Sequence, residues 1–313
     1  MSDYLIIGAG AVGTAVAERL AVSDHRVTVV TRSGSGPNDP RITRVAADAT
    51  QGDRIAQLAQ GSAAIFNCAN PPYNRWSTDW PPIANSLLGA AERTGAVLVT
   101  TGNLYVYGHV TAPMSPETPE LADFEKAKVR MKMWSDALDA HNSGCLRATE
   151  VRASDFIGAS AQSLMGQRVV PKVLAGKSCQ VLGRLDVTHS WTYIDDVART
   201  LIACAQQPVA WGKVWHAPTN PSRTQREVIN DFADVAGVEH VKISVVPNAL
   251  LRVLGLFNPL VRELPKTMYQ FTAPFVIDDS STREVLGLQP TPWHDVLSAT
   301  IAAYRRGRGQ VSY

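Results

Sequence analysis

The chain has 313 residues, of which 45% are hydrophobic and 19% are charged, and its formal net charge at pH 7 is +2. A chain of this length and composition can bury a large core without disulfides, so disorder is not expected. The small net charge gives no electrostatic reason to bind nucleic acid or a membrane surface, and we expect neither partner.

Four cysteines are scattered along the chain: Cys68, Cys145, Cys179 and Cys204. Their spacing matches neither a metal site nor a disulfide framework, so we expect mostly inert core thiols and no metal. The first strand pattern begins by residue 4, which leaves no room for a signal peptide, and no apolar run approaches the length of a membrane span. These features predict a cytoplasmic protein.

The stretch YLIIGAGAVGTAVAERLA runs from an apolar strand pattern through three glycines into an Ala-rich helix pattern. Gly8, Gly10 and Gly13 have the spacing G-x-G-x-x-G, which between a strand and a helix is typical of dinucleotide binding. Gly8 permits the tight turn, Gly10 lets the backbone approach a pyrophosphate, and Gly13 lets the helix pack closely. The helix start at Ala11 and Val12 then presents free N–H groups to phosphate. An ordinary strand-to-helix turn is the alternative.

Strand patterns alternate with helix patterns through the first half of the chain, from YLIIG to CLRATEVRA. This alternation predicts an α/β fold, a doubly wound parallel sheet (Rossmann fold) with helices on both faces and ligands beyond the carboxyl ends of the strands. The second half is less regular and predicts a smaller C-terminal substrate lobe. We expect a dinucleotide-binding domain over residues 1–158, to which residues 191–220 return, and a mainly substrate-binding lobe over residues 159–313.

Two segments are candidates for the walls of a substrate pocket. The apolar residues 247–275 predict helical core of the second lobe, or in part the wall of an apolar pocket. The stretch PPYNRWSTDWPP carries Tyr73, Trp76 and Trp80 and would hang over the carboxyl ends of the strands. We expect it either to close an aromatic lid on a substrate or only to pack its own loop.

The order of motifs resembles that of the extended short-chain dehydrogenases/reductases, the family of nicotinamide-dependent epimerases, dehydratases and reductases. The resemblance covers nearly the whole chain and rests on GAGAVG, ADAT, FNCAN, TTGNLYVYG, the lysine helix, VRASDFIG and WTYIDDVA. Extended members usually have G-x-x-G-x-x-G, whereas here Ile7 stands at the first glycine and Gly8 supplies the turn. This departure indicates an atypical branch.

The expected cofactor is NADP, with NAD possible. An NAD enzyme of this fold generally has a carboxylate at the end of the second strand, but this chain has Thr31, Arg32 and Ser33. A guanidinium pairs well with a 2′-phosphate, although Arg32 could also be a solvated loop charge. The resemblance implies that Asp48 meets the adenine, unless it is only a helix N-cap, and that the backbone around Ala69 passes the ribose.

The catalytic residues of the family are only partly matched. The resemblance implies a Ser or Thr that holds the substrate oxygen, a Tyr that passes the proton, and a Lys four residues later. That Lys binds the nicotinamide ribose and lowers the pKa of the Tyr. Here Asn103 stands at the Ser position, Phe124 at the Tyr position and Lys128 at the Lys position. The lysine is present, but the usual proton donor is missing.

The helix pattern KAKVRMKMWSDALDAHN carries Lys128 and three further basic residues on the face that we expect to be exposed: Lys126, Arg130 and Lys132. A solvated run of charge is therefore the alternative role for Lys128. This helix and PPIANSLLGAAERTG correspond to the pair through which relatives often dimerise, so we expect a homodimer. The first of them offers three residues for such a contact: Val129, Met133 and Trp134.

Other polar groups could replace the missing tyrosine. If the chain stays extended after the fifth strand, four side chains share one face: Thr101, Asn103, Tyr105 and Tyr107. Tyr107 is the family's VYG tyrosine, which often packs structurally, so Tyr105 is the first candidate. Asp155 is the second, as a base near the nicotinamide or merely as an N-cap.

These features together favour an NADP-dependent oxidoreductase or epimerase-like enzyme that acts on a small, fairly apolar metabolite. The alternative is a non-catalytic NADP(H)-binding redox sensor or regulatory protein. The missing tyrosine favours the alternative, whereas the intact second lobe and its apolar pocket candidates favour the enzyme.

Overall fold

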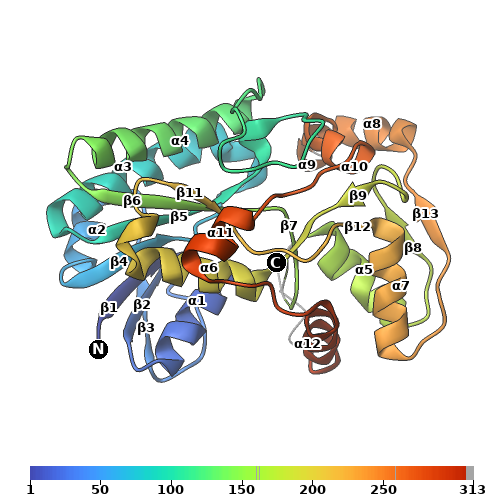
Figure 1. Ribbon diagram of the computed structural model, residues 1–313, viewed down its shortest axis with the longest axis horizontal. Helices are drawn as coiled ribbons and strands as arrows, with labels where there is room; N and C mark the ends of the chain where they lie inside the picture. The colour runs from blue at the N-terminus through green and yellow to red at the C-terminus, as the bar shows by residue number, and fades with distance from the viewer. Residues whose placement is uncertain (160, 162, 258, 308–313) are drawn as a thin grey trace.

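The computed structural model describes residues 1–159, 161, 163–257 and 259–307. Its larger part is a seven-stranded sheet in the order β11-β6-β5-β4-β1-β2-β3, with every neighbouring pair parallel (Figure 1). The strands are β1 (Asp3–Ile7), β2 (Arg26–Thr31), β3 (Ile42–Ala46), β4 (Ser62–Asn67), β5 (Val97–Asn103), β6 (Arg147–Ala153) and β11 (Val214–His216). The predicted doubly wound α/β fold is confirmed.

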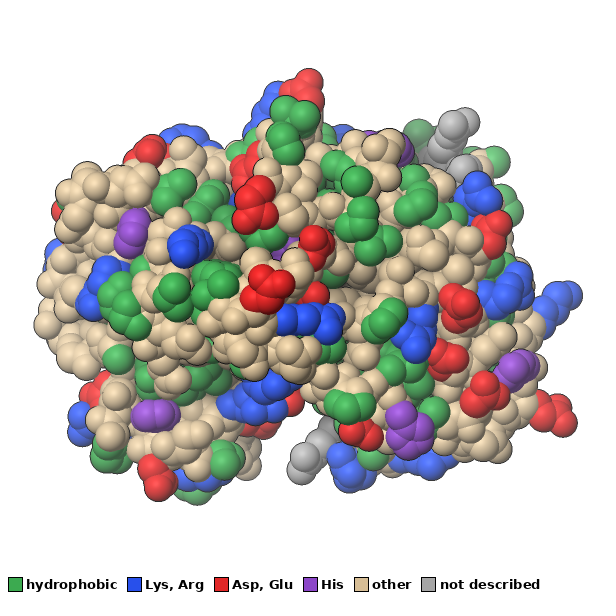
Figure 2. All heavy atoms as spheres, in the orientation of Figure 1, with side chains coloured by type: hydrophobic (Ala, Val, Ile, Leu, Met, Phe, Trp, Pro, Cys, Tyr) green, Lys and Arg blue, Asp and Glu red, His purple; other side chains and the backbone are tan. Residues whose placement is uncertain are grey.

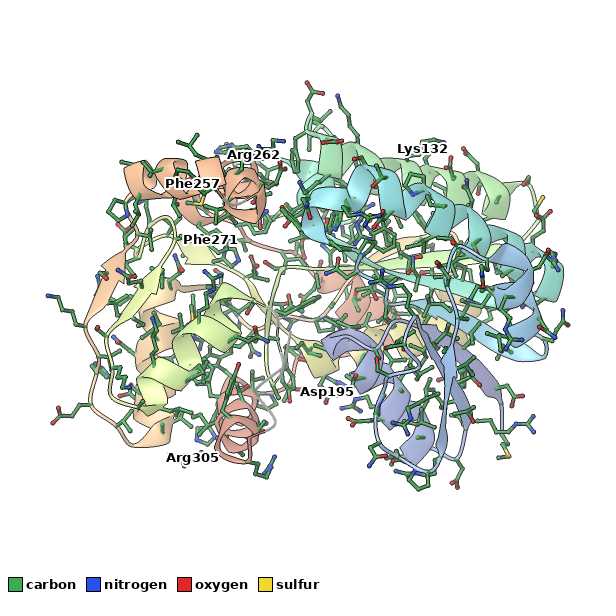
Figure 3. The ribbon with its side chains drawn as sticks, turned by 180° about the vertical axis from the view of Figure 1, so that it is seen from behind. Lys132, Asp195, Phe257, Arg262, Phe271 and Arg305 are labelled. Atoms are coloured by element: carbon green, nitrogen blue, oxygen red, sulfur yellow. The ribbon has the colours of Figure 1, made fainter. Side chains whose placement is uncertain are left out.

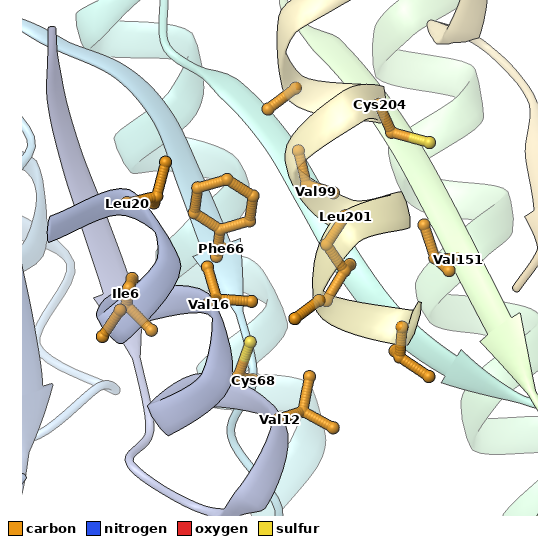
Figure 4. Packing of buried hydrophobic residues seen from close by; sticks show 14 of the residues in the cluster. Ile6, Val12, Val16, Leu20, Phe66, Cys68, Val99, Val151, Leu201 and Cys204 are labelled. Atoms are coloured by element: carbon orange, nitrogen blue, oxygen red, sulfur yellow. The ribbon is translucent and has the colours of Figure 1, made fainter. Parts of the chain in front are cut away.

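Helices cover both faces of this sheet because its strands are apolar on both sides. On one face Ile6 and Phe66 pack against Val16 of α1 and Leu201 of α6 (Figure 4). On the other face the side chain of Leu5 and its neighbours pack against three helices, α2, α3 and α4. The five helices are α1 (Ala11–Val22), α2 (Gly52–Leu58), α3 (Trp76–Thr94), α4 (Glu125–Asn142) and α6 (Ile194–Gln206).

A smaller lobe stands beside the sheet, on the right of Figure 1, and is built from short paired strands and helices with a separate core. Its strand pairs are β7 with β10, β8 with β13, and β9 with β12. Its strands are β7 (Asp155–Ile157), β8 (Cys179–Val181), β9 (Thr188–His189), β10 (Trp191–Tyr193), β12 (Arg223–Thr224) and β13 (Ile243–Val245). The remaining helices are α5 (Leu164–Leu174), α7 (Gln225–Ala236), α8 (Asn248–Phe257), α9 (Pro259–Glu263), α10 (Tyr269–Thr272), α11 (Ser280–Leu286) and α12 (Trp293–Arg305).

The apolar segment 247–275 only partly fits the expected helical core. Helix α8 lies at the surface and exposes four large apolar side chains: Leu250, Val253, Leu256 and Phe257. Phe257, labelled in Figure 3, is 84% exposed. Elsewhere in the segment Leu251, Thr267 and Gln270 are buried, as is Phe275 at its end. The second expectation, that part of this segment walls a pocket, concerns Gln270 and Phe275 near its end.

The order of the strands in the sheet determines where a ligand crevice can form. Strand β1 lies between β4 and β2, so the chain order reverses at β1 and leaves a crevice beyond the carboxyl ends of β1 and β4. The start of α1 and the segments that follow β4 and β5 meet at this edge.

Surface charge, helix hydrophobicity and one buried thiol describe the rest of the molecule. On the face in Figure 2, acidic and basic side chains are interspersed rather than gathered in a patch of one sign. In the described ranges, no helix combines the length and apolarity that a membrane crossing requires. Cys68 is buried, and its burial raises the pKa of the thiol to about 12, so this thiol stays protonated.

Candidate functional site

The three glycines of the turn between β1 and α1 differ in how much space surrounds each of them. Gly8 has a φ of +99°, a conformation that other residues rarely adopt, and a β-carbon there would lie 2.6 Å from the carbonyl oxygen of Cys68. A β-carbon on Gly13 would lie 2.1 Å from the carbonyl oxygen of Gly8. A β-carbon on Gly10, in contrast, would meet nothing within 4 Å. The turn is thus tight at Gly8 and Gly13 and open at Gly10.

The start of α1 is free to receive an anion. Gly10 is the N-cap, so no side chain caps the helix, and its first turn contains no acidic residue. The first backbone N–H groups of a helix have no partner within the helix, and the helix dipole adds partial positive charge there. With the open space at Gly10, this arrangement fits the pyrophosphate of a dinucleotide.

A cavity of about 320 Å³ opens beside this helix start. Eight of the residues expected from the sequence line it: Gly10, Ala11, Val12, Ala69, Thr101, Asn103, Tyr105 and Asp155. The structure therefore brings residues from four separate segments of the chain to one place. Its volume and mixed apolar and polar lining are those of a small-molecule site.

One wall of the cavity is aromatic. Tyr73, on a 3₁₀ turn over Tyr73–Arg75, and Trp76, at the start of α3, both line it. Trp80 is fully buried one helical turn beyond Trp76. The expected overhanging loop is thus largely the first turns of α3, and two of its three aromatic residues face the cavity.

The structure corrects the expected position of Lys128. Its side chain is 62% exposed, forms an ion pair with Asp123 and does not line the cavity. The expected exposed charge run is also wrong in part, because Lys126 and Arg130 are buried, whereas Lys132 points outward (Figure 3), as Lys128 does. Residues four apart share one face of a helix, whereas a residue midway between them lies roughly 200° around it.

Arg130 takes the position at the cavity that was expected for Lys128. Its Nη1 donates to the carbonyl oxygen of Thr101 at 3.2 Å, and its guanidinium carbon lies 4.7 and 4.3 Å from the ring centres of Trp76 and Trp80. Burial lowers the pKa of Arg130 to about 10, an effect that the charge of Glu150 opposes. The guanidinium therefore stays charged at neutral pH, and no ion pair to it is found among the described residues.

Lys126 lies one turn before Arg130 and joins the two lobes. Its ammonium forms an ion pair with Glu263 of α9 and lies 4.3 Å from the ring centre of Tyr73. The pKa of Glu263 is lowered mainly by its hydrogen bond from Lys126. This cation is thus neutralised across the junction of the lobes.

The chain after β5 does not stay extended, so the expected common face is not formed. It turns at η2 (Tyr105–Tyr107), a 3₁₀ turn that separates the two tyrosines. Tyr105 lines the cavity, whereas Tyr107 turns into the core and makes a 2.8 Å hydrogen bond with Nε2 of His216. The side chain of Asn103 accepts a 3.1 Å hydrogen bond from the backbone N–H of Tyr105 and so shapes this turn.

Tyr105 is a weak acid in this setting. Burial raises its pKa well above 10, and neighbouring Tyr73 and Asp155 raise it further. The hydroxyl of Tyr73 donates to the Tyr105 oxygen at 3.3 Å, and Phe124, the N-cap of α4, packs 5.9 Å from the Tyr105 ring. The nearby cation is Arg130, whose guanidinium interacts electrostatically with Tyr105, in place of the Lys of the Lys–Tyr pair that the resemblance implies.

Asp155 begins strand β7 and is not a helix N-cap. Its Oδ2 lies 2.8 Å from Nε2 of His189, a residue of β9 that is 2% exposed. The other ring nitrogen of His189, Nδ1, lies 3.0 Å from the carbonyl oxygen of Gln270. Asp155 therefore faces the cavity with a buried histidine behind it.

The residues expected at the adenosine end lie at the ends of β2 and β3. Arg32 is exposed, and the two hydroxyls beside it contact Ser35: Thr31 Oγ1 donates to its carbonyl oxygen at 2.8 Å and Ser33 Oγ to its Oγ at 2.9 Å. Asp48 accepts hydrogen bonds from Thr50, chiefly from its backbone N–H, and these lower the pKa of Asp48.

Asp48 is not the N-cap of α2, since that position belongs to Gln51. The N-cap alternative for Asp48 is therefore ruled out, and Asp48 instead begins a tight turn, which its carboxylate closes by accepting from Thr50.

Three buried polar atoms of the cavity wall lack a hydrogen-bond partner within the described structure: Arg130 Nε, Ser154 Oγ and Gln270 Nε2. Buried polar atoms are rarely left unpaired, so these atoms indicate a polar ligand. The sequence contained a signal for Arg130. Lys126 and Arg130 are four residues apart, as Phe124 and Lys128 are, so they form a second pair with the spacing of the family's Tyr and Lys, shifted by two positions. We found no local signal for His189, Ser154 or Gln270.

The fold and the site together define a nicotinamide dinucleotide-binding enzyme of the Rossmann type. The model of the NAD dependent epimerase/dehydratase family matches residues 4–216, and the chain belongs to this family. No curated protein matches the chain at a significant level.

Solved structures with the same fold cover nearly the whole chain. A UDP-glucose 4-epimerase from Thermotoga maritima is 15% identical, with coverage of 97% of this chain and 99% of that one and a TM-score of 0.80. A UDP-N-acetylglucosamine 4-epimerase from Methanobrevibacter ruminantium is 15% identical, with coverage of 98% and 100% and a TM-score of 0.81. A dTDP-glucose 4,6-dehydratase from Streptomyces venezuelae with NAD bound is 19% identical, with coverage of 98% of each chain and a TM-score of 0.77. At these identities the likeness concerns the fold.

Proposed function

We propose that the protein binds NADP(H) across the start of α1 and interconverts a carbonyl and an alcohol in a small, fairly apolar metabolite. The observation that carries this proposal is the uncapped helix start, which opens at Gly10 into a cavity with an aromatic wall. When bound, the nicotinamide would supply or accept the hydride. The residues of this chain would orient the substrate and exchange the proton.

The preference for NADP over NAD is supported by the end of β2. Residues 31–33 contain no carboxylate for the ribose hydroxyls of NAD, and the exposed guanidinium of Arg32 is free of side-chain hydrogen bonds among those described. Arg32 is therefore the proposed partner of a 2′-phosphate, and Asp48 the proposed contact of the adenine. We assign the nicotinamide ribose to Arg130 in place of Lys128, since Arg130 is the cation in the described cavity wall.

The residues that line the cavity support the proposed substrate class. Arg130 is the only basic residue among the described residues that line the cavity, and the nearby Lys126 is already paired with Glu263. A nucleotide diphosphate would need more positive charge than this. Aromatic and apolar side chains fill much of the wall, so a small, fairly apolar carbonyl compound fits better.

The proposed organisation assigns residues 1–158 and 191–220 to cofactor binding and residues 159–313 mainly to substrate binding.

We also propose a homodimer through α3 and α4, although Met133 and Trp134 are buried within the protomer and do not present a contact face. Val129 remains partly exposed. Light scattering at micromolar concentration should give about twice 33.8 kDa, and a mass near 33.8 kDa would contradict the dimer.

The enzyme is tested by single-turnover oxidation of NADPH against a panel of small aromatic and alicyclic aldehydes and ketones. We expect measurable turnover with a subset of the panel and poor turnover of generic carbonyl compounds.

The second candidate, a non-catalytic NADP(H) sensor, is favoured by Phe124, which supplies no proton at the usual tyrosine position. Tight NADPH binding without turnover of any compound would select the sensor.

A further inference from the structure

The pair formed by Asp155 and His189 belongs to the wall of the cavity and has no counterpart in the Ser/Thr, Tyr and Lys set of the family. Asp155 lines the cavity with 27% of its side chain exposed, and His189 lies directly behind it with 2% exposed. These two residues are 34 positions apart in the chain. The strands β7 and β9 bring them together.

The hydrogen bonds of His189 fix where its protons lie. A carbonyl oxygen only accepts hydrogen bonds, so the 3.0 Å contact of Nδ1 with the Gln270 carbonyl requires a proton on Nδ1. In a neutral imidazole the other nitrogen, Nε2, then carries a lone pair. This lone pair would face Oδ2 of Asp155 at 2.8 Å.

Two acceptors cannot share so short a contact without a proton between them. The pair therefore holds one proton there, as an imidazolium with a carboxylate or as an imidazole with a carboxylic acid. Both forms have no net charge, which suits a buried position. An ionised Asp155 beside a neutral Nδ1–H imidazole would repel the lone pair and leave a net negative charge.

The surroundings hold this arrangement in one orientation. The His189 ring stacks on Phe271 with ring centres 5.0 Å apart and on Phe275 at 5.3 Å, and it contacts Trp191 at 4.6 Å. Phe271 is labelled in Figure 3. The ring is thus clamped by aromatic side chains, so it cannot rotate freely to exchange its hydrogen-bond partners.

Besides His189, three phenols of the neighbouring elements interact with Asp155 among the described residues. Tyr73, Tyr105 and Tyr269 each interact electrostatically with Asp155, and burial is the largest cause that raises the pKa of each. These hydroxyls hold their protons strongly and are poor donors at neutral pH. The short contact between Asp155 and His189 holds a further proton at this wall.

We propose that the Asp155–His189 pair is the proton donor of the site, with Asp155 as the catalytic residue and His189 as its positioning residue. This inference rests on the proposed function. In a reduction, a bound nicotinamide would supply the hydride to the carbonyl carbon, and the pair would donate its proton to the carbonyl oxygen, which gives the alcohol. Asp155, being partly exposed, then regains a proton from water; the oxidation runs through the same steps in reverse.

The proton is tested by nuclear magnetic resonance on the full chain without cofactor, with labelled histidine nitrogens and labelled aspartate carboxyl carbons. We expect Nδ1 of His189 to be protonated, and either Nε2 or the Asp155 carboxyl to carry the second proton. The Asp155→Asn substitution should abolish the signal of the shared proton. A neutral His189 with a bare Nδ1, or a neutral Nδ1–H ring beside an ionised Asp155, would overturn the proposal.

The catalytic role is tested by single-turnover NADPH oxidation with the panel compound that the native protein reduces fastest. Asp155→Asn should lower the rate about 100- to 10,000-fold with NADPH affinity nearly unchanged, because general acid catalysis contributes on that scale. Asp155→Glu should restore part of the rate, and His189→Gln should lower kcat more than it changes KM. Asp123→Asn, at an exposed carboxylate on the surface, is the matched control and should keep the native rate.

The outcomes separate this inference from the proposed function. A native rate in Asp155→Asn would remove Asp155 as the donor and leave the proposed function standing. Failure of the native protein to bind NADPH would overturn the proposed function, whatever the resonance data show. NADPH binding without any turnover would contradict the donor role and favour the sensor.

Discussion

Gly13 lies so close to Gly8 that a β-carbon on Gly13 would stand 2.1 Å from the Gly8 carbonyl oxygen. Gly10 lies between them with open space on its side-chain position. The three glycines of one motif therefore serve different purposes: two of them let the backbone pack, and the third leaves room for a ligand.

This difference predicts opposite effects of two matched substitutions. Gly13→Ala should lower the free energy of unfolding by about 1–3 kcal/mol or more, because the methyl group would overlap backbone. Gly10→Ala should change stability by less than about 1 kcal/mol but weaken NADPH binding about tenfold or more, because its methyl group would occupy the approach of the pyrophosphate. Urea unfolding and calorimetric titration measure both. Native NADPH affinity in Gly10→Ala would argue against phosphate at this turn.

The two cations of α4 should differ in their effect on cofactor binding. Arg130→Met keeps the apolar part of the side chain between Trp76 and Trp80 but removes the charge, so it should weaken NADPH binding about tenfold or more. Lys128→Met, its matched control at the surface, should change the affinity by less than about twofold, since an exposed ion pair contributes little. The reverse ranking in a fluorescence titration would restore the ribose role to Lys128.

The choice between NADP and NAD should depend on Arg32. NADPH should bind more tightly than NADH, and Arg32→Ala should remove most of the difference. A charge-assisted contact of this type contributes about 1.5–3 kcal/mol, or roughly ten- to a hundredfold in affinity. Arg54→Ala, at an exposed arginine that contacts Gln57 on α2, is the control. Equal calorimetric affinities of the native protein for NADPH and NADH would exclude the preference.

Stability should fall in acid because of His216. Its Nδ1 donates to the Asp278 carbonyl at 2.9 Å, its Nε2 accepts from Tyr107, and burial lowers its pKa to about 3. The unfolded chain, with a histidine pKa near 6.5, binds one more proton between these values. The stability from neutral His216 is therefore complete above about pH 6.5 and is lost as the pH falls toward 3, by up to about 1.4 kcal/mol per unit.

Urea unfolding at pH 7.5, 6 and 5 checks this dependence. The His216→Gln variant lacks the titrating ring, so its stability should fall less steeply over this range than that of the native protein. Parallel curves for the two proteins would show that His216 does not set the slope.

The fold was predictable because its signals are local. The first strand, the glycine turn and the helix that follows lie within about twenty residues, and each reports its own structure through hydrophobic period and glycine spacing. The sheet follows from repeating such units. The glycine turn and the helix start beside the cavity were therefore largely anticipated.

The wall that carries Arg130, Tyr105 and Asp155 was not, because distant contacts decide it. The pattern of α4 predicts a helix but not which charges are buried; Lys126 is held by Glu263, which is 137 residues away, and Arg130 by the tryptophans of α3. An extended chain would place Tyr105 and Tyr107 on one face, but a single 3₁₀ turn separates their side chains. His189 meets Asp155 only through the packing of the second lobe.

The most direct test of the account is the crystal structure of the protein with NADPH. We predict the pyrophosphate at the start of α1, the 2′-phosphate beside Arg32, the nicotinamide ribose beside Arg130 and nicotinamide C4 in the cavity that Asp155 lines. A dinucleotide that leaves this cavity empty, or whose nicotinamide ribose lies away from Arg130 and its neighbours, would contradict the central claim.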